Sequence, residues 1–398
     1  MRLSSRTKLI KPSATLAVTA EVARLRASGV EVIDFGAGEP DFDTPQRIKD
    51  AAIRALEAGM TKYTPVAGTK EVREAVVAKL KRVNGLEYSV DETIVSCGGK
   101  HTLYNAFQAL FGPGDEVVLP APFWVSYADM LVLAGATPVV VQAPASQGFK
   151  LRPEQLASAI NERTRGVVLN SPSNPTGAAY QESELRALAE VLLKHPDVAI
   201  IADDVYEMLY FDDARPPHLL RIAPELRERT VIVNSVSKTY AMTGWRLGYA
   251  AAPADVVKAM ATIQGQCTSN PTAIVQAAAV EALTGPQDEL PAMVDEFRWR
   301  RDYVMQRLAD LPGVTCVKPS GAFYAFPDVS GLFERRWRGE PLGNAQRVCA
   351  FLLAEARVAL VAGDDFAAPQ HIRLSYATSR TNLERGFDAI ARALRTLE

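Results

Sequence analysis

The most chemically distinctive part of this chain is a lysine with hydroxyl residues before it and an arginine after it. Ser235 and Ser237 precede Lys238, and Arg246 stands eight positions beyond it. Lysine forms imines with aldehydes, and its pKa falls readily when the amine is desolvated. Serine hydroxyls and the guanidinium fork suit the oxygens of a phosphate. An isolated lysine is usually a surface residue, but this combination predicts a site that binds a phosphorylated aldehyde as an imine.

These residues follow a short apolar segment, and such segments recur along the chain. Helical patterns, for example over 100–111 and 182–193, separate several of them. The segments that we interpret as strands are 93–96, 116–119, 137–141, 166–170, 198–202, 230–234 and 247–251. Near-continuous apolar strands between helices indicate a mostly parallel sheet with both faces covered. Because ligands bind beyond the carboxyl ends of such strands, we expect the polar residues there to form one site.

Composition and charge argue against several classes of protein. The chain has 398 residues and a net charge of −2, without the concentrated basic face that nucleic acids require. No apolar run is long enough to span a membrane, and the N-terminus does not resemble a secretory signal, so we expect a soluble, cytoplasmic protein. Cys97, Cys267, Cys316 and Cys349 form no C-x-x-C pair. We therefore expect buried free thiols and no metal site.

The pattern of segments changes near residue 290. A long charged helix is predicted over 290–311, followed by short strand patterns at 322–326 and 371–375. The first 40 or so residues do not continue the alternation of strands and helices. The length of the chain suits two domains. We therefore expect a large domain over 43–294 and a smaller α+β domain formed by 1–42 together with 295–398.

Several motifs resemble, in the same order, those of the class I aminotransferases, which are pyridoxal 5′-phosphate (PLP) enzymes of fold type I. Besides Ser235-x-Ser237-Lys238, the motifs are Gly36-Ala37-Gly38-Glu39-Pro40-Asp41-Phe42, Lys62-Tyr63, Gly98-Gly99-Lys100, Asn170-Ser171-Pro172-x-Asn174-Pro175-Thr176-Gly177, Asp203-x-x-Tyr206, Gly244-Trp245-Arg246-x-Gly248-Tyr249 and Arg373-Leu374-Ser375-Tyr376-Ala377. The resemblance covers almost the whole chain. It implies an α/β fold with a mostly parallel, seven-stranded sheet and a smaller α+β domain, with PLP held by Lys238 as a Schiff base.

The resemblance also implies how the cofactor is held at its phosphate. Gly99 and Lys100 begin a predicted helix, where free backbone N–H groups suit a phosphate. The other phosphate contacts expected from the resemblance come from Ser235, Ser237, Arg246 and, from the neighbouring subunit, Tyr63. The last of these implies a homodimer with shared sites.

At the cofactor ring, the resemblance implies that Trp124 stacks on the pyridine, and that Asn174 and Tyr206 hydrogen-bond its phenolate oxygen. Asp203 is expected to pair with the pyridine nitrogen and keep it protonated. The next residue, Asp204, is also acidic. The spacing to Tyr206 selects Asp203 rather than its neighbour.

For the substrate, the resemblance implies that Arg373 clamps the α-carboxylate, with Gly38, Trp124 and Asn174 nearby. The segment 11–15 and Lys100 resemble a bacterial subgroup of aspartate aminotransferases whose closest members also transaminate prephenate. In that subgroup the distal carboxylate is received by residues that correspond to Ser13, Thr15 and Lys100, and Lys11 corresponds to a lysine associated with prephenate.

The implied reaction is ping-pong transamination, in which L-aspartate and 2-oxoglutarate give oxaloacetate and L-glutamate. Conversion of prephenate to arogenate is a second reaction that the resemblance suggests. His101, Ser269-Asn270-Pro271-Thr272 and the segment 362–366 depart from the subgroup. An aminotransferase for another amino acid, or a lyase or cyclase of the same fold, therefore remains an alternative. A regulatory PLP sensor would need a DNA-binding domain, and a nicotinamide oxidoreductase would need a G-x-G-x-x-G turn; neither is visible.

Overall fold

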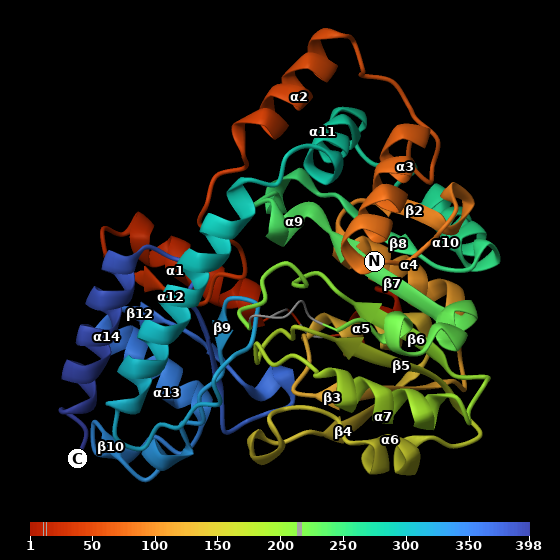
Figure 1. Cartoon of the computed structure of the whole chain (residues 1–398). Coiled ribbons are helices and arrows are strands. Elements are labelled where there is room, and N and C mark those ends of the chain that lie inside the picture. The colour runs from red at the N-terminus through yellow and green to blue at the C-terminus, as the bar shows by residue number, and fades with distance from the viewer. Residues whose placement is uncertain (11, 13, 213–216) are drawn as a thin grey trace.

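A seven-stranded sheet forms the centre of the structure, a computed structural model that describes residues 1–398 apart from 11, 13 and 213–216 (Figure 1). Its strand order is β2-β8-β7-β6-β5-β3-β4. The bounds are β2 (Thr93–Ser96), β3 (Glu116–Ala121), β4 (Thr137–Gln142), β5 (Thr164–Asn170), β6 (Ala199–Asp203), β7 (Thr230–Ser235) and β8 (Gly248–Ala251). Only β8 runs against its neighbours, β2 and β7. This arrangement confirms the predicted mostly parallel, seven-stranded sheet.

The strands read as continuous apolar runs because successive side chains enter two different cores. Val117 and Leu119 of β3 pack with one cluster of buried residues, while Val118 between them packs with the other. The first cluster is completed by α4 (Gly99–Leu110), α5 (Ser126–Ala134) and α10 (Ala254–Cys267). The second is completed by helices that include α3 (Lys70–Lys79), α6 (Pro153–Ala159) and α7 (Glu182–Leu192). Both faces of the sheet are therefore covered by helices.

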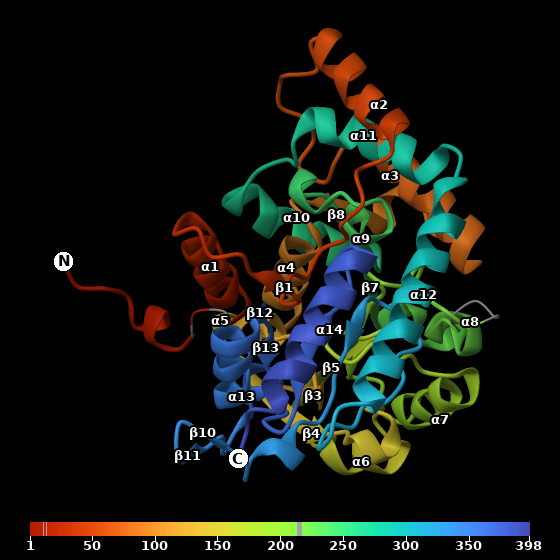
Figure 2. The same cartoon turned by 90° about the vertical axis from the view of Figure 1, so that its left-hand side faces the viewer.

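A segment near the beginning of the chain, 14–34, lies beside the elements from the end of the chain, next to this sheet (Figures 1 and 2). β1 (Ile33–Asp34) pairs in parallel with β12 (Val358–Ala359). A three-stranded antiparallel sheet joins β13 (Val361–Ala362), β14 (Ile372–Ser375) and β9 (Tyr324–Ala325). The helices α1 (Ala14–Ala27), α12 (Glu289–Ala309), α13 (Ala345–Phe351) and α14 (Arg380–Leu394) surround these strands. The segment 14–34 thus contacts the last part of the chain.

The remaining elements are α2 (Gln46–Glu57), α8 (Leu219–Ile222), α9 (Val236–Thr239), α11 (Ala273–Thr284) and the hairpin of β10 (Arg336–Trp337) with β11 (Glu340–Pro341). The strand predicted over 322–326 is limited to 324–325 in the structure, and Ala322, with a positive φ of 58°, lies outside it. All four cysteines are free. The expectation of buried thiols was wrong for Cys267, which is exposed at the end of α10, and Cys97, Cys316 and Cys349 are only half-buried. In the part of the chain that the structure describes, every helix is too short or too polar to cross a membrane.

A buried ion pair ties α3 to the strand ends on one side of the sheet. Lys79 and Glu207 have side chains that are 4% and 8% exposed, and their charged atoms are in contact. The same carboxylate accepts hydrogen bonds from the side-chain amides of Asn84 and Asn234, each at 2.6 Å. Asn234 also accepts a hydrogen bond from the backbone N–H of Ser235 at 2.7 Å. The pair therefore supports the turn in which the chain leaves β7.

Replacing Lys79 with methionine should destabilise the fold strongly. Glu207 would keep its charge in a buried position with only amide donors, and breaking a buried pair in this way costs about 3–5 kcal/mol. Lys70→Met is the matched control, because Lys70 pairs with Glu74 through side chains that are 75% and 52% exposed. That change should cost at most about 1 kcal/mol. Thermal unfolding of both variants tests this, and equal unfolding midpoints would mean that the two asparagines alone satisfy Glu207.

Candidate active site

The carboxyl ends of the parallel strands open into a cavity of about 250 Å³. Thirteen residues expected from the sequence line it: Thr15, Gly38, Gly99, Lys100, Trp124, Asn174, Asp203, Tyr206, Ser235, Ser237, Lys238, Arg246 and Arg373. Tyr63 does not line the cavity, and its side chain is 91% exposed. Lys11 and Ser13 lie outside the described residues. The structure thus brings together residues that are up to 358 positions apart in the chain.

One end of the cavity is built from the start of α4. Gly98 precedes that helix with a φ of 93°, in the left-handed region that favours glycine. The hydrogen bonds of the helix begin at His101, whose N–H donates to the Gly98 carbonyl, so the earlier amides of Gly99 and Lys100 have no partner within the helix. Free amides at a helix start attract anions. A β-carbon on Gly248 would collide with the Gly99 amide nitrogen.

Hydroxyl and cationic side chains complete this end. The hydroxyl oxygens of Ser235 and Ser237 lie 2.7 Å apart. Arg246 donates from Nη1 to the Thr243 carbonyl at 2.9 Å, and a β-carbon on Gly98 would collide with its guanidinium. The pKa of Lys100 is lowered, first by burial and then by repulsion from Arg246. Repulsion between cations is relieved when an anion binds between them, as a phosphate would.

A buried carboxylate lies deeper in the cavity, at the end of β6. Asp203 is 4% exposed and accepts hydrogen bonds from the Tyr127 hydroxyl at 2.5 Å and from the Val205 N–H at 3.3 Å. Burial raises the pKa of this carboxyl to about 6, although the hydrogen bond from Tyr127 opposes the rise. A carboxyl of this kind can share a proton with a ring nitrogen placed opposite it.

Sequence reasoning missed two tyrosines in the cavity. Tyr127 stands three positions after Trp124, and that spacing at a helix start brings side chains to one side, which could have identified it. Tyr324 comes from β9, and its hydroxyl lies 2.9 Å from the hydroxyl of Tyr206. No pattern in the sequence connects these two residues, which are 118 positions apart.

The Lys238 amine lies near the middle of the site. It donates a hydrogen bond to the Gly38 carbonyl and lies 6.0 Å from the centre of the Tyr206 ring. The pKa of Lys238 is lowered to about 8, chiefly by burial; Glu39 opposes the shift and Arg373 adds to it. A lysine with such a pKa can act as a nucleophile or a base near neutral pH.

Arg373 carries a buried charge opposite the lysine. It extends from β14, is 2% exposed, and donates to the Asn174 side-chain oxygen at 3.0 Å and to the Gly36 carbonyl at 2.9 Å. Its Nε atom is buried without a hydrogen-bond partner, and no carboxylate of the described residues pairs with its charge. A buried unpaired charge is costly. A ligand carboxylate would satisfy this guanidinium.

Comparison with known proteins identifies the family. Residues 30–390 match the family model described as aminotransferase class I and II. The chain belongs to this family. An aspartate/prephenate aminotransferase of Cereibacter sphaeroides is 51% identical over 95% of this chain and 94% of the relative. An aspartate aminotransferase of Geobacillus stearothermophilus is 47% identical, with 98% of each chain covered.

Solved structures agree with the family in fold. Aspartate aminotransferase from Rhizobium meliloti superimposes with a TM-score of 0.97 at 45% identity, covering 100% of both chains. The enzyme from Thermus thermophilus, solved with maleate, gives a TM-score of 0.91 at 45% identity over 99% of this chain and 100% of that one. This aminotransferase is therefore an enzyme with the α/β architecture of PLP fold type I.

The residues of this aminotransferase fit PLP, the cofactor of its family. The turn at Gly98 and Gly248 leaves no room for a β-carbon and presents free amides together with the cationic Arg246. The half-buried amine of Lys238 and the buried carboxyl of Asp203 line the same cavity. A phosphate, an aldehyde and a ring nitrogen would each meet a suitable group of the chain.

Lys238 should react at a lower pH than an ordinary lysine, whose pKa is about 10.4. Because burial holds its pKa at about 8, half of its amine is neutral at that pH and more is neutral above it. In the cofactor-free protein, acetylation of Lys238 followed by peptide mass spectrometry should rise with a midpoint near pH 8. Lys70, whose side chain is 75% exposed, is the comparison in the same sample. Superimposable profiles for the two lysines would contradict the assignment.

Proposed function

We propose that this aminotransferase transfers the amino group of L-aspartate to 2-oxoglutarate, with PLP bound at Lys238. The observation that carries the proposal is the unpaired guanidinium of Arg373, which faces the same cavity as Lys238. The amino acid and the 2-oxo acid both have an α-carboxylate for this group. Lys100 and Thr15 line the cavity as well and would receive the second carboxylate of either substrate. The names of the relatives at 51% and 47% identity support this choice.

Each group of the site has a task in this proposal. The amides of Gly99 and Lys100, with Ser235, Ser237 and Arg246, hold the phosphate. Trp124 would lie against the ring, Asn174 and Tyr206 would donate to its phenolate oxygen, and Asp203 would face its nitrogen. PLP, when bound, supplies the electron sink that makes the α-proton of the amino acid acidic.

The chain supplies the proton transfer. Lys238, once displaced by the amino acid, would accept the α-proton on its amine and return it on the far side of the substrate nitrogen, to the carbon that had carried the lysine. Its pKa of about 8 suits a base that must both take and give a proton near neutral pH. Arg373 orients the substrate by its carboxylate, so that the α-hydrogen points towards the lysine.

We also propose the domain limits that the sequence suggests, 43–294 and 1–42 with 295–398. The pairing of β1 with β12 supports the joining of the two terminal parts. Crystal structures with and without a dicarboxylate would test these limits, because two domains would move as separate rigid bodies. Motion about different limits would contradict them.

Absorption spectra of the purified holoenzyme test the reaction. Adding L-aspartate should convert the Schiff-base band to that of the aminated cofactor, and 2-oxoglutarate should restore it, because each half-reaction is complete in itself. Prephenate in place of 2-oxoglutarate tests the second acceptor suggested by the relatives' names. The Lys238→Ala variant should not cycle. If the chromophore is present but aspartate leaves it unchanged, another amino acid is the donor.

We further propose that the enzyme is a homodimer in which Tyr63 reaches the phosphate of the partner's site. Exposed apolar side chains support an interface. They are Met1, Leu3 and Leu9 in the N-terminal segment, which stands away from the body in Figure 2, and Ile53, Leu56 and Tyr63 in and after α2. Apolar surface of this kind often marks a protein contact.

Mixed dimers test whether Tyr63 acts across the interface. Lys238→Ala and Tyr63→Ala subunits should each be weak or inactive alone. After the two are mixed and reassociated, half of the dimers carry one site with both intact residues, so activity should return to roughly a quarter of wild type. If Tyr63 acts within its own subunit, mixing restores nothing. Sedimentation of the wild type as a monomer would also contradict the proposal.

A further inference from the structure

Tyr127 makes a contact with the ring-facing carboxylate that no role assigned so far explains. Its hydroxyl donates to Asp203 Oδ2 at 2.5 Å, and the two residues are 2% and 4% exposed. The pKa of Tyr127 is raised well above its usual value, first by burial and then by the charge of Asp203. The phenol therefore keeps its proton, and it is the donor in this hydrogen bond.

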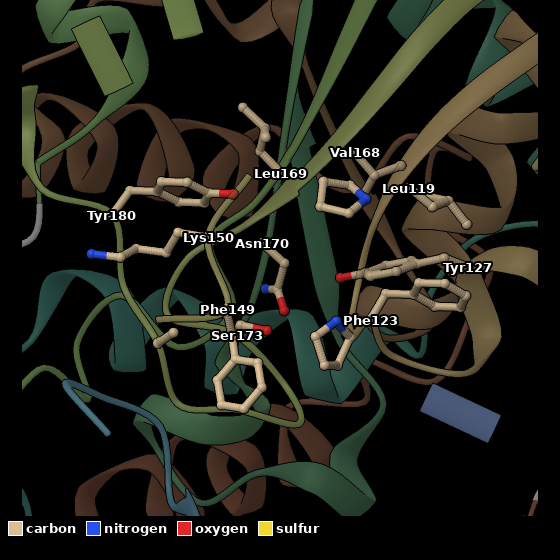
Figure 3. A pocket seen from close by; sticks show the side chains of 13 residues that line it. Leu119, Phe123, Tyr127, Phe149, Lys150, Val168, Leu169, Asn170, Ser173 and Tyr180 are labelled. Atoms are coloured by element: carbon tan, nitrogen blue, oxygen red, sulfur yellow. The ribbon is translucent and has the colours of Figure 1, made fainter. Parts of the chain in front are cut away.

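The ring of Tyr127 is fixed by its neighbours. It packs edge-on against Trp124, with 5.3 Å between ring centres and 88° between the planes. Its ring centre also lies 6.5 Å from that of Phe107. Behind it lies a small cavity of about 30 Å³, shown in Figure 3, where Tyr127 and Tyr180 enter from opposite sides with their hydroxyls pointing inward. Packed rings with one polar atom each give that atom a fixed direction.

We infer that Tyr127 is a positioning residue, which keeps the Asp203 carboxylate ionised and aimed at the cofactor and thereby controls the proton on the ring nitrogen. The inference rests on the role proposed above for Asp203. A buried carboxylate has lost the water that would stabilise its charge, and a hydrogen bond to the charged form replaces part of that stabilisation. Lys238 and the Val205 amide act in the same direction, but only the phenol donates to Oδ2 among the described residues.

Loss of the phenol hydroxyl should shift the shared proton. Without this donor the carboxylate becomes more basic, so the proton between Asp203 and the ring nitrogen moves towards the oxygen. A ring nitrogen that carries less of the proton withdraws electrons less effectively, and removal of the α-proton slows. Binding of the substrate carboxylate at Arg373 involves neither group. The effect should therefore appear in kcat rather than in KM.

The test is the Tyr127→Phe holoenzyme, loaded with PLP labelled with ¹⁵N in the ring. Its nitrogen resonance should move towards that of unprotonated pyridine, and kcat for aspartate should fall roughly 10- to 100-fold, as expected for a hydrogen bond to a charged group. Tyr180→Phe is the matched control. Tyr180 is also buried and lines the same small cavity. Its hydroxyl accepts a hydrogen bond from the Leu151 N–H at 2.9 Å, and this bond does not involve Asp203. The Tyr180→Phe variant should therefore leave the resonance unchanged.

Two further variants separate the possible failures. Asp203→Asn must itself move the ¹⁵N resonance; if it does not, the proposed role of Asp203 is wrong. If Asp203→Asn moves the resonance and Tyr127→Phe does not, Tyr127 has only a packing role. Should Tyr127→Phe fail to fold, a ring-fluorinated tyrosine at position 127 retains the packing and donates more strongly. It should move the resonance in the opposite direction, and an unchanged resonance would overturn the inference.

Discussion

The buried guanidinium of Arg373, without a carboxylate partner among the described residues, is the feature on which the rest of the site depends. A protein can hold such a charge only if surrounding polar groups and an incoming anion compensate it. Asn174 and the Gly36 carbonyl occupy two of its donors and fix its orientation. Burial chiefly lowers the pKa of Lys238, and the charge of Arg373 adds to this shift. Arg373 therefore contributes both to recognition of the substrate and to activation of the lysine.

The buried pair of Lys79 and Glu207 shows what distinguishes a functional cation from a structural one. Lys79 is as buried as Arg373, but it has its counter-ion in the protein, and its neighbour Asn234 supports the backbone at Ser235. The attraction between Lys79 and Glu207 therefore stabilises the folded state and is not available to a ligand. Arg373 lacks a counter-ion, so the stabilisation that a carboxylate would give it becomes available to the ligand. The fold tolerates the free-energy cost of burying this charge because both faces of the sheet are covered by packed helices.

The sequence was most informative where burial imposes a pattern on it. Strands that are buried on both faces must be largely apolar, and the edge strand β4 is apolar at its centre although it is only partly buried, so all seven could be located and the polar residues at their ends could be assigned to one cavity. Arg373 was recognisable because a charged side chain within an apolar segment is costly to bury, which indicates a role inside the protein. Tyr127 was missed because a tyrosine in an apolar helix usually serves the core, and Tyr324 because its partner is 118 residues away. Cys267 was wrongly expected to be buried, since the helix α10 that contains it turns that end to the surface.

The two groups expected to hold the ends of a dicarboxylate differ in how strictly they require one. Arg373 is buried, so its charge stays uncompensated when the ligand position beside it is empty or holds an uncharged group. Lys100 also lines the cavity, but its residue is largely exposed although burial lowers the pKa of its amine, so water can still solvate its ammonium in part when no carboxylate is present. An α-carboxylate is thus close to obligatory, whereas the distal group can vary at modest cost. Selectivity between acceptors would then arise from Lys100 and other residues that line the cavity, such as Thr15, rather than from the groups that carry out the chemistry.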